Sequence, residues 1–435
     1  MRKGPPDLPG AFILALAAAD QSFVERIGPK AANLAALARA GLPTPGGFCV
    51  DANAYRAQIA ALGLQDLVLR FDAGDPPVQR RLAVDIRLAL YEQPVADAVR
   101  VPLLAAWQAL RTESGAPLAV RSSTLIEDRK GASFAGQFES FLGIDSDAAF
   151  LTAVRACWAA LWTTNARRYM ENCGLSPAAT AMAVLVQPLI DARASGGGLS
   201  ETAEGQMLIS ATWGLGSAIA QGEVVPDRIV LSRQGFLRTI EPGRKHHRDT
   251  CVHGSGAAPQ AVASELVAAP CLDAAQAVTL ARMMRKAEDV MGGPVEIEWA
   301  LDDGGFKLLQ ARPLTVERPA LPDEIWRRHP RLSGHPAGIG WGAGRAVVVS
   351  CECELARVAP GDVLVTRVAG PALGHVLARV AAVVSELGGS TSHLASLARE
   401  RGIPMVLGVL DATARIPDGS QVAVDGVAGV VRWMA

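Results

Sequence analysis

The sequence has almost no excess of charge of either sign. Its 435 residues include 42 basic and 43 acidic side chains, which gives a formal net charge of −1. Such a chain has no overall field that would draw it to nucleic acid or to an anionic membrane surface. We therefore expect neither nucleic acid nor a membrane among its partners. The one dense basic run, residues 244–248, follows a Pro-Gly pair and is predicted to be a solvated loop, with a phosphate-binding role as the alternative.

Long hydrophobic runs are also missing. The run from 11 to 19 has nine apolar residues and follows Arg2 and Lys3, so it superficially resembles a signal peptide. Prolines interrupt the approach to this short run, and we expect a first buried strand or helix there instead. No run supplies the roughly 20 apolar residues that a membrane-spanning helix requires.

Cysteines are few and scattered. There are seven, an odd number, which fits reduced thiols in a cytoplasmic protein better than a framework of disulfides. Cys351 and Cys353 are close in sequence, but no second pair lies at the spacing of metal ligands. We therefore predict a strand with two small apolar side chains there rather than a metal site.

The composition predicts a globular protein of two or three domains. Half of the residues are hydrophobic and 20% are charged, and 435 residues exceed one ordinary core. The segment 313–337 holds five prolines and few aliphatic residues, which is typical of an extended, semi-rigid linker. The 100 residues from 336 to 435 are enough for one small domain.

Helical and strand patterns alternate along the chain, which favours an α/β (α+β) fold. Pro29 suits the first turn of a helix, and Gly41 with Pro43 ends it. A hairpin is expected across the Asp-Asp-Gly-Gly stretch that starts at Asp302. The predicted elements are a helix over 29–41, a strand over 181–190, hairpin strands over 295–301 and 306–311, strands near 363–366 and 380–385, and a helix over 390–401.

The most specific stretch is residues 388–404, which read GGSTSHLASLARERGIP. His393 lies in the first turn of its predicted helix, where backbone N–H groups are unpaired and the helix dipole is positive. A phosphoryl group on the imidazole would be stabilised there. Thr391 or Ser392 could hydrogen-bond the ring and fix which nitrogen attacks. The alternative is a capped helix with an incidental histidine.

This stretch resembles the phosphohistidine segment of the pyruvate phosphate dikinase and phosphoenolpyruvate synthase family, to which antibiotic phosphotransferases for rifampicin are related. Earlier segments are similar to the family's ATP-grasp domain, in the family's order. They are residues 28–34, 41–48, 121–128, 132–137, 213–216, 226–227, 296–299 and 309–313. The resemblance implies an ATP-grasp domain over 1–315 with lobes of about 1–178 and 179–315, a linker over 316–335, and a swivelling α/β phosphohistidine domain over 336–435.

The resemblance also implies that ATP and Mg²⁺ phosphorylate His393 with release of AMP. Lys30 begins a helix, so its ammonium and the free backbone donors can meet polyphosphate together. Arg121 follows a strand-like stretch, and its guanidinium can grip phosphate through two nitrogens. In the loop 131–137, backbone N–H groups near Gly136 and Gln137 could close over phosphates, with a polar turn as the alternative.

Two further positions follow from the resemblance. Gln187, on a predicted buried strand, stands where the family has an adenine-side contact; a core glutamine bonded to backbone is the alternative. A three-residue, glycine-bulged loop would set Glu298 opposite Gln310 and Glu296 opposite Arg312. An even-numbered loop would instead put Glu298 and Gln310 on opposite faces. With the three-residue loop, Glu298 and Gln310 are metal and nucleotide ligands, and Arg312 contacts phosphate. The alternative is an exposed hairpin with cross-strand salt bridges.

The sequence departs from the family in places. Residues 194–201 are glycine-rich where the family has a Ser-Gly-Val strand and a Phe-Thr pair, Ser217 replaces a glutamate, and Pro29 replaces a glycine. The chain ends about thirty residues after the His393 helix, so we expect no acceptor-binding domain in it. Three hypotheses follow for its role: a split phosphoenolpyruvate synthase-like system with a separate acceptor-domain protein, a phosphotransferase for a small-molecule acceptor such as an antibiotic or biosynthetic intermediate, or a nucleotide-binding regulator without turnover.

Overall fold

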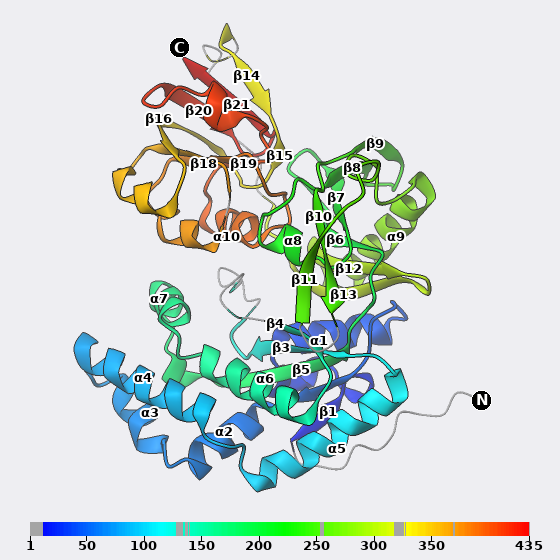
Figure 1. Cartoon of the computed structure of the whole chain (residues 1–435), viewed down its shortest axis with the longest axis vertical. Coiled ribbons are helices and arrows are strands. Elements are labelled where there is room, and N and C mark those ends of the chain that lie inside the picture. Colours follow the sequence, from blue (N-terminus) through cyan, green and yellow to red (C-terminus); the bar gives the residue numbers. More distant parts are fainter. Residues whose placement is uncertain are drawn as a thin grey trace. The chain divides into compact units, whose positions relative to one another are not determined.

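The computed structural model describes residues 12–127, 134, 138, 140–252, 256–316, 326, 328–368 and 370–434 (Figure 1). The chain divides into two compact units. The first comprises Met1–Ile190, Cys251–Ala258 and Lys307–Arg312, and the second comprises Asp191–Thr250, Pro259–Phe306 and Pro313–Ala435. Each unit combines strands with helices, so the predicted α/β (α+β) class is confirmed. The division into an ATP-grasp domain, a linker and a mobile domain stays a prediction.

The first unit is built on a five-stranded antiparallel sheet in the order β1-β2-β5-β3-β4. Its strands are β1 (Ile13–Ala15), β2 (Phe48–Val50), β5 (Met182–Pro188), β3 (Leu118–Thr124) and β4 (Ser140–Ile144). The central strand β5 is buried from Met182 to Gln187, as expected where both faces of a sheet are covered. The buried strand predicted over 181–190 is thus confirmed. The strand or helix predicted in the N-terminal apolar run is present as the strand β1, which is buried at Ile13.

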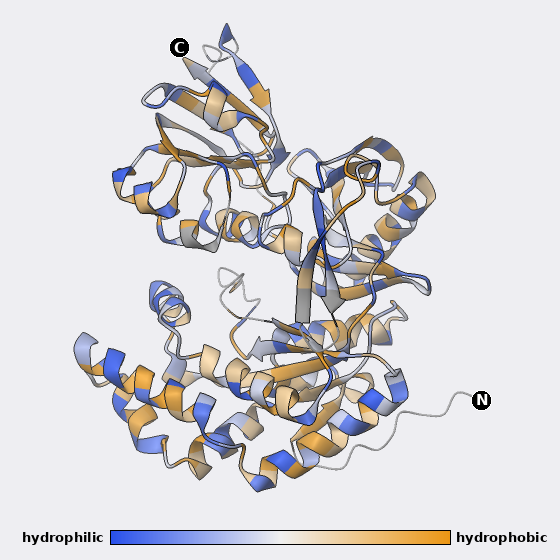
Figure 2. Ribbon diagram, in the orientation of Figure 1, coloured by the Kyte–Doolittle hydropathy of each residue, from blue (hydrophilic) through white to orange (hydrophobic). Residues whose placement is uncertain are grey.

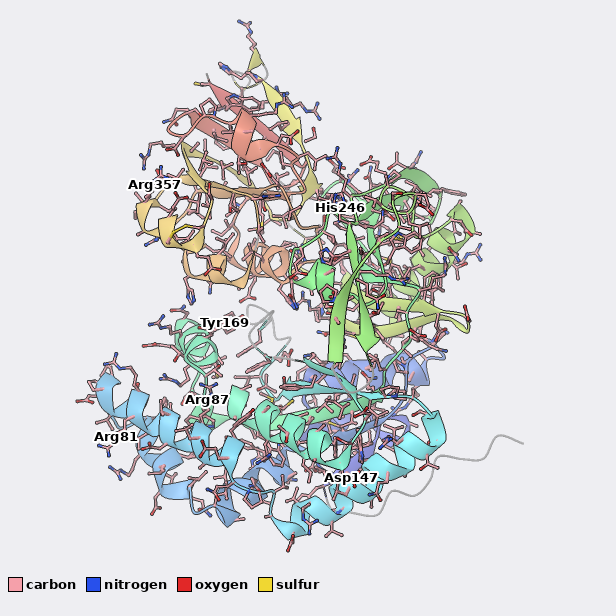
Figure 3. All side chains as sticks on the ribbon, in the orientation of Figure 1. Arg81, Arg87, Asp147, Tyr169, His246 and Arg357 are labelled. Atoms are coloured by element: carbon pink, nitrogen blue, oxygen red, sulfur yellow. A yellow bond between two sulfur atoms is a disulfide. The ribbon has the colours of Figure 1, made fainter. Side chains whose placement is uncertain are left out.

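The first unit also contains helices. They are α1 (Val24–Arg39), α2 (Ala52–Ala61), α3 (Gln65–Phe71), α4 (Pro76–Glu92), α5 (Asp97–Ser114), α6 (Asp147–Ala160) and α7 (Thr164–Asn172). Of these helices, α1, α2, α5 and α6 contact the strands of this sheet. Hydrophilic and hydrophobic residues alternate along them, as expected for helices with one buried face (Figure 2). Between α5 and α6, the rings of Trp107 and Phe150 stack at 4.4 Å, and Trp107 Nε1 donates to Asp147 at 2.9 Å. Asp147 is labelled in Figure 3.

Helix α1 changes direction at Gly28. This glycine has a φ of 77°, which interrupts the helix, and the helical path resumes at Pro29 as predicted. A Cβ on Gly28 would lie 2.6 Å from Ser123 Oγ and 2.8 Å from the Thr124 carbonyl oxygen. A glycine is therefore needed for both the backbone angle and the close approach of α1 to β3. The helix predicted over 29–41 is confirmed, and it ends at Arg39.

The second unit contains a six-stranded sheet in the order β13-β12-β6-β7-β8-β9. Its strands are β13 (Gly305–Pro313), β12 (Val295–Asp302), β6 (Ala194–Leu199), β7 (Gln206–Trp213), β8 (Asp227–Ser232) and β9 (Leu237–Glu241). Helix α9 (Ala274–Met291) packs on it, begins with a capping box between Asp273 and Gln276, and ends at Gly292 in the left-handed conformation. The short helix α8 (Ser217–Ala220) and the two-stranded sheet of β10 (His247–Val252) and β11 (Gly256–Ala261) complete this part.

The C-terminal part of the second unit has an eight-stranded sheet, in the order β14-β21-β20-β16-β17-β18-β19-β15. Its strands are β14 (Arg331–Ser333), β15 (His335–Pro336), β16 (Trp341–Val349), β17 (Val363–Thr366), β18 (Ala382–Ser385), β19 (Met405–Leu407), β20 (Gln421–Asp425) and β21 (Val430–Met434). Strands β16 to β19 run parallel, and α10 (His393–Arg401) connects β18 to β19. The predicted strands and helix of this region are confirmed. Strands β14 and β15 come from the predicted linker, whose residues 317–325 and 327 lie outside the described residues.

Two sequence-based expectations are wrong. Cys351 and Cys353 are joined by a disulfide, and they lie at the start of a 3₁₀ segment, Glu352–Arg357, rather than in a strand. In the basic run 244–248, Lys245 is fully buried and ion-paired with the equally buried Asp227, while His246 is exposed (Figure 3). The run is therefore not a solvated loop throughout, because one of its charges has a partner 18 residues away in the sequence. In the described part of the chain, no helix is both long and apolar enough to cross a membrane.

Candidate active site

Lys30 lies two residues after the break in α1, beside strand β3. Its Nζ is 2.6 Å from Glu127 Oε1 and donates to the Ser122 carbonyl oxygen at 3.1 Å. The Lys30 side chain is 12% exposed and that of Glu127 is 5% exposed, so the pair is largely shielded from water. Three residues along α1, Asn33 Nδ2 donates to the Ala311 carbonyl oxygen at 3.3 Å. The start of α1 therefore lies against both β3 and β13.

Arg121 is on β3, opposite Leu185 of β5. Its Nη1 donates to the carbonyl oxygen of Leu309 at 3.3 Å, one residue before Gln310 on β13. The first unit thus holds Lys30, Arg121, Gln310 and Arg312 on neighbouring elements, although Gln310 and Arg312 are more than 180 positions from Arg121 in the sequence. Lys30 and Arg121, two of the three side chains expected to bind phosphate, therefore lie on elements beside β13, the strand that carries the third, Arg312.

Gln187 is buried near the end of β5, opposite Ala119. Its Nε2 donates to the Gly46 carbonyl oxygen at 3.1 Å. A Cβ on Gly47 would lie 2.1 Å from the Val186 carbonyl oxygen, so this segment sits close against β5. The hydrogen bond to backbone is the alternative that the sequence left open, and an adenine contact for Gln187 stays a prediction.

Of the predicted phosphate loop, residues 131–137, the structure describes Phe134. Gly136 and Gln137 lie outside the described residues. Phe134 is buried with a φ of 52°, a value that non-glycine residues rarely adopt. Its backbone N–H donates to the hydroxyl of Tyr169 on α7 at 3.3 Å, and the two rings lie 4.6 Å apart. Phe134 itself therefore packs against α7.

Glu298 belongs to the second unit and lies on β12, opposite Gly197 of β6. A Cβ on Gly197 would point at Thr391, 2.5 Å from its Cβ. Residues opposite each other in a sheet share a face, so the Glu298 side chain is on the face of β12 that Thr391 contacts. The next pair, Ile297 and Gly198, is on the other face, since a Cβ on Gly198 would meet Met284 of α9.

The hairpin that joins β12 to β13 has the predicted glycine conformation. Gly305 has a φ of 101°, whereas Asp303 and Gly304 do not have a positive φ. This combination is what a glycine-bulged loop requires. Strand β12 ends at Asp302 and strand β13 begins at Gly305, so the loop between them consists of Asp303 and Gly304. The loop is one residue shorter than the predicted three-residue loop, because Gly305 already belongs to β13. That the Glu298 and Gln310 side chains lie on the same face of the hairpin stays a prediction.

His393 is the first residue of α10, and Ser392 is its N-cap. Ser392 Oγ accepts from the Ala395 N–H at 3.2 Å, and Gly402 ends the helix with a φ of 67°. Of the two hydroxyls expected to orient the imidazole, the one on Ser392 is therefore used as a cap. Thr391 Oγ1 is buried and makes no hydrogen bond to the residues that the structure describes. Thr391 is thus the better candidate for orienting the ring.

Sequence reasoning missed three charged residues of the site. Glu127 is the partner of Lys30, and Glu296 and Arg399 form a buried ion pair beside the His393 helix. All three lie in segments that carry the family resemblance. The usable signal was an acidic or basic residue at a buried position of a strand or helix, because such a charge needs a partner.

Comparison with known proteins shows the family of the chain. Residues 24–329 match the family described as "Pyruvate phosphate dikinase, AMP/ATP-binding domain", and residues 358–429 match "PEP-utilising enzyme, mobile domain". A probable phosphoenolpyruvate synthase of Methanothermobacter thermautotrophicus is 32% identical over 93% of this chain and 61% of its own length. Phosphoenolpyruvate synthases of Aeropyrum pernix and Escherichia coli are 31% and 30% identical, over 97% and 93% of this chain and 58% and 55% of their own lengths. The chain thus spans little more than half the length of these relatives. It belongs to the pyruvate phosphate dikinase and phosphoenolpyruvate synthase family.

Proposed function

We propose that this chain is a phosphotransferase that uses ATP and Mg²⁺ to phosphorylate His393, releases AMP, and passes the phosphoryl group to an acceptor. The observation that carries the proposal is the place of His393. It begins a capped helix, where backbone N–H donors and the helix dipole favour a dianion on the ring. The adjoining Thr391 contacts the strand pair that carries Glu298.

Lys30, Arg121 and Arg312 would bind the phosphates of ATP in this proposal. Lys30 and Arg121 are already held by backbone carbonyl oxygens of the first unit, so little side-chain entropy is left to lose on binding. Glu127 would hold the Lys30 ammonium in place between turnovers. The match of residues 24–329 to an AMP/ATP-binding domain supports the assignment.

Glu298 and Gln310 would hold the Mg²⁺ ion. Both offer hard oxygen donors, and Mg²⁺ is usually bound through one or two carboxylates together with substrate phosphates. The described residues include no group of three or more His, Cys, Asp or Glu that could hold a metal on their own. The nucleotide phosphates would supply further ligands to the ion. The bound ion would neutralise charge on the phosphates during transfer.

AMP release defines the bond that breaks. An imidazole nitrogen of His393 attacks the β-phosphorus, the bond from that phosphorus to the α,β-bridging oxygen breaks, and AMP leaves with the electron pair. The β-phosphoryl group, still bearing the γ-phosphate, is then on the ring. Water would next cleave the β,γ phosphoanhydride bond and release the γ-phosphate as inorganic phosphate, which leaves one phosphoryl group on His393 for the acceptor. Thr391 would orient the imidazole, while the cations stabilise the negative charge by position rather than by covalent chemistry.

We propose that the phosphoryl group is passed on in the same type of reaction as in the matched relatives, which are named phosphoenolpyruvate synthases. In this proposal a separate acceptor-domain protein binds a small carboxylic acid of the pyruvate type, as in a split synthase. The phosphoryl group would reach it from His393.

Product analysis tests the function. The chain is incubated with Mg-ATP, and nucleotides are separated with and without pyruvate and candidate partner proteins. We expect AMP rather than ADP, loss of AMP formation in His393→Ala, and retention in His375→Ala, whose histidine is exposed in the same region. ADP as the product, or AMP formation by His393→Ala at the rate of the unaltered chain, would rule the proposal out.

A further inference from the structure

A buried ion pair joins the helix of His393 to the strand of Glu298. Arg399 Nη2 on α10 lies 2.9 Å from Glu296 Oε2 on β12, and each side chain is only 9% exposed. Ser396 Oγ donates to the other oxygen of the same carboxylate, Glu296 Oε1, at 3.1 Å. Glu296 lies in the region that matches the AMP/ATP-binding domain, whereas Ser396 and Arg399 lie in the region that matches the mobile domain.

Arg399 is also fixed within its own region. Its Nη1 donates to the Ser390 carbonyl oxygen at 2.5 Å and to the Ala337 carbonyl oxygen at 3.4 Å. The guanidinium therefore connects the segment before His393, through its own helix, to the carboxylate of β12. A buried charge that loses such a partner has no water to replace it, so this contact depends on both residues.

A second contact, at Gly197, depends on shape rather than charge. A Cβ on Gly197 would lie 2.5 Å from Thr391 Cβ, 2.7 Å from Thr391 Cγ2 and 2.8 Å from Thr391 Oγ1. Real Cβ atoms do not approach other atoms so closely, so Thr391 occupies the space that any side chain at 197 would need. Gly197 has no positive φ, and its backbone would accept another residue. The absence of a side chain there makes room for Thr391.

Two more contacts involve the glycines before His393. Gly388 N–H donates to the Val224 carbonyl oxygen at 3.1 Å. A Cβ on Gly389 would lie 2.4 Å from Pro226 Cγ. Segment 388–399 thus contacts the AMP/ATP-binding region at both ends and in the middle, through hydrogen bonds, one ion pair and close glycine contacts.

We infer that Glu296 and Gly197 are positioning residues, which seat segment 388–399 on β6 and β12 and so place His393 for phosphorylation. Glu296 and Glu298 are two positions apart on a strand, so they share the face on which the segment sits. The docked arrangement is then the one in which His393 accepts phosphate. This consequence rests on the proposed function, whereas the docking site itself does not.

Neighbouring glycines on β6 allow a matched test of docking. Gly197→Ala places a methyl group against Thr391, and Gly198→Ala places the same group against the terminal methyl of Met284, a flexible side chain that can move. Hydrogen–deuterium exchange of the full chain, without nucleotide, measures the docking. We expect exchange in peptides covering 388–399 to rise about tenfold in Gly197→Ala and in Glu296→Gln, and to stay unchanged in Gly198→Ala.

Peptides from β16 and β17 provide the folding control, because these strands lie in the core of the C-terminal sheet. Their exchange should be the same in all variants. If Gly197→Ala and Glu296→Gln both exchange over 388–399 like the unaltered chain, the docking site is wrong. The same conclusion follows if Gly198→Ala raises exchange there as much as Gly197→Ala does.

Single-turnover kinetics separate positioning from binding. We expect both docking variants to slow labelling of His393 from Mg-ATP by on the order of tenfold or more, with the ATP concentration for half-maximal rate unchanged. Glu296→Asp, which keeps the charge, should recover part of the rate. A docking variant that labels at the full rate would refute the positioning role. If the unaltered chain does not label but the exchange results hold, the proposed function fails and the docking site stands.

Discussion

The carboxylate of Glu127 lies 2.6 Å from the ammonium of Lys30, within the first unit of the chain. Both side chains are shielded from water, and the Thr124 N–H donates to the other carboxylate oxygen at 3.3 Å. Lys30 is thus held in one position by a residue at the end of the Arg121 strand. The ion pair therefore fixes the position of the long, flexible Lys30 side chain before phosphate binds.

Glu127→Gln tests this relationship. The substitution keeps the shape of the side chain but removes the charge that compensates Lys30. We expect the free energy of unfolding, measured with urea, to fall by about 3 kcal/mol, since breaking a buried pair leaves one charge uncompensated. Labelling from ATP should weaken but persist, whereas Lys30→Met should abolish it. Equal loss of labelling in the two variants would assign a direct role to Glu127.

The ion pair between Asp227 and Lys245 is a second buried pair, in the second unit. Both side chains are fully buried, and Asp227 also accepts from the Gly243 N–H at 2.8 Å and the Cys271 N–H at 2.7 Å. Asp227→Asn should lower the free energy of unfolding by about 4 kcal/mol, because it leaves Lys245 buried without a counter-charge. Arg248→Ala, in the same basic run but exposed, should change it by less than about 0.5 kcal/mol. Urea denaturation of both variants measures these two changes in the free energy of unfolding. An equally small change in Asp227→Asn would contradict the burial of the Asp227–Lys245 pair.

His335 makes stability depend on pH. Burial, with a smaller contribution from the positive charge of Arg228, lowers the pKa of this imidazole from 6.5 to about 4. Between these values the unfolded chain binds a proton that the folded chain does not, so stability falls as pH drops from 6.5 to 4. The loss should reach roughly 3 kcal/mol at pH 4.

His335→Gln checks this linkage. Thermal or urea unfolding between pH 4 and 7 should show a flatter dependence in the variant than in the unaltered chain. His375→Gln, at an exposed histidine, is the control and should keep the original slope. An unchanged slope in His335→Gln would mean that carboxylates alone set the acid sensitivity.

Glu298 should matter for the metal rather than for folding. Its side chain is on the face of β12 that Thr391 contacts, and it is only partly buried. We expect Glu298→Gln to raise the Mg²⁺ concentration for half-maximal labelling about tenfold and to leave unfolding nearly unchanged. Leu309→Ala, an apolar change on β13, should instead reduce stability by about 1–2 kcal/mol and spare the Mg²⁺ dependence. A Glu298→Gln variant with unaltered Mg²⁺ dependence would remove Glu298 from the site.

Local signals explain what could be predicted from the sequence. Ser392, Gly402 and Pro404 mark the ends of α10 within a few residues, so the position of His393 at a helix start followed from neighbours alone. Likewise, the Gly28-Pro29 pair marked the start of the Lys30 helix. Such features depend on backbone conformations that only a few residue types favour.

Long-range pairing explains what could not be predicted. Glu296 and Arg399 are 103 positions apart, and nothing in the sequence around either residue says that the other is its partner. Lys245 lies in a run of charges that looks solvated, and only the fold places Asp227 beside it. The Cys351–Cys353 disulfide was missed because an odd, scattered set of cysteines favours free thiols.

One measurement tests the central claim most directly: labelling of the full chain with ATP that carries the radioactive atom in its β-phosphate, followed by mapping of the labelled peptide. A phosphoryl group on an imidazole is lost in acid and kept in base, unlike one on serine or threonine. The account predicts stoichiometric, Mg²⁺-dependent, acid-labile label on the peptide that contains His393, and none in His393→Ala. Label on another residue, or equal label in His393→Ala, would contradict it.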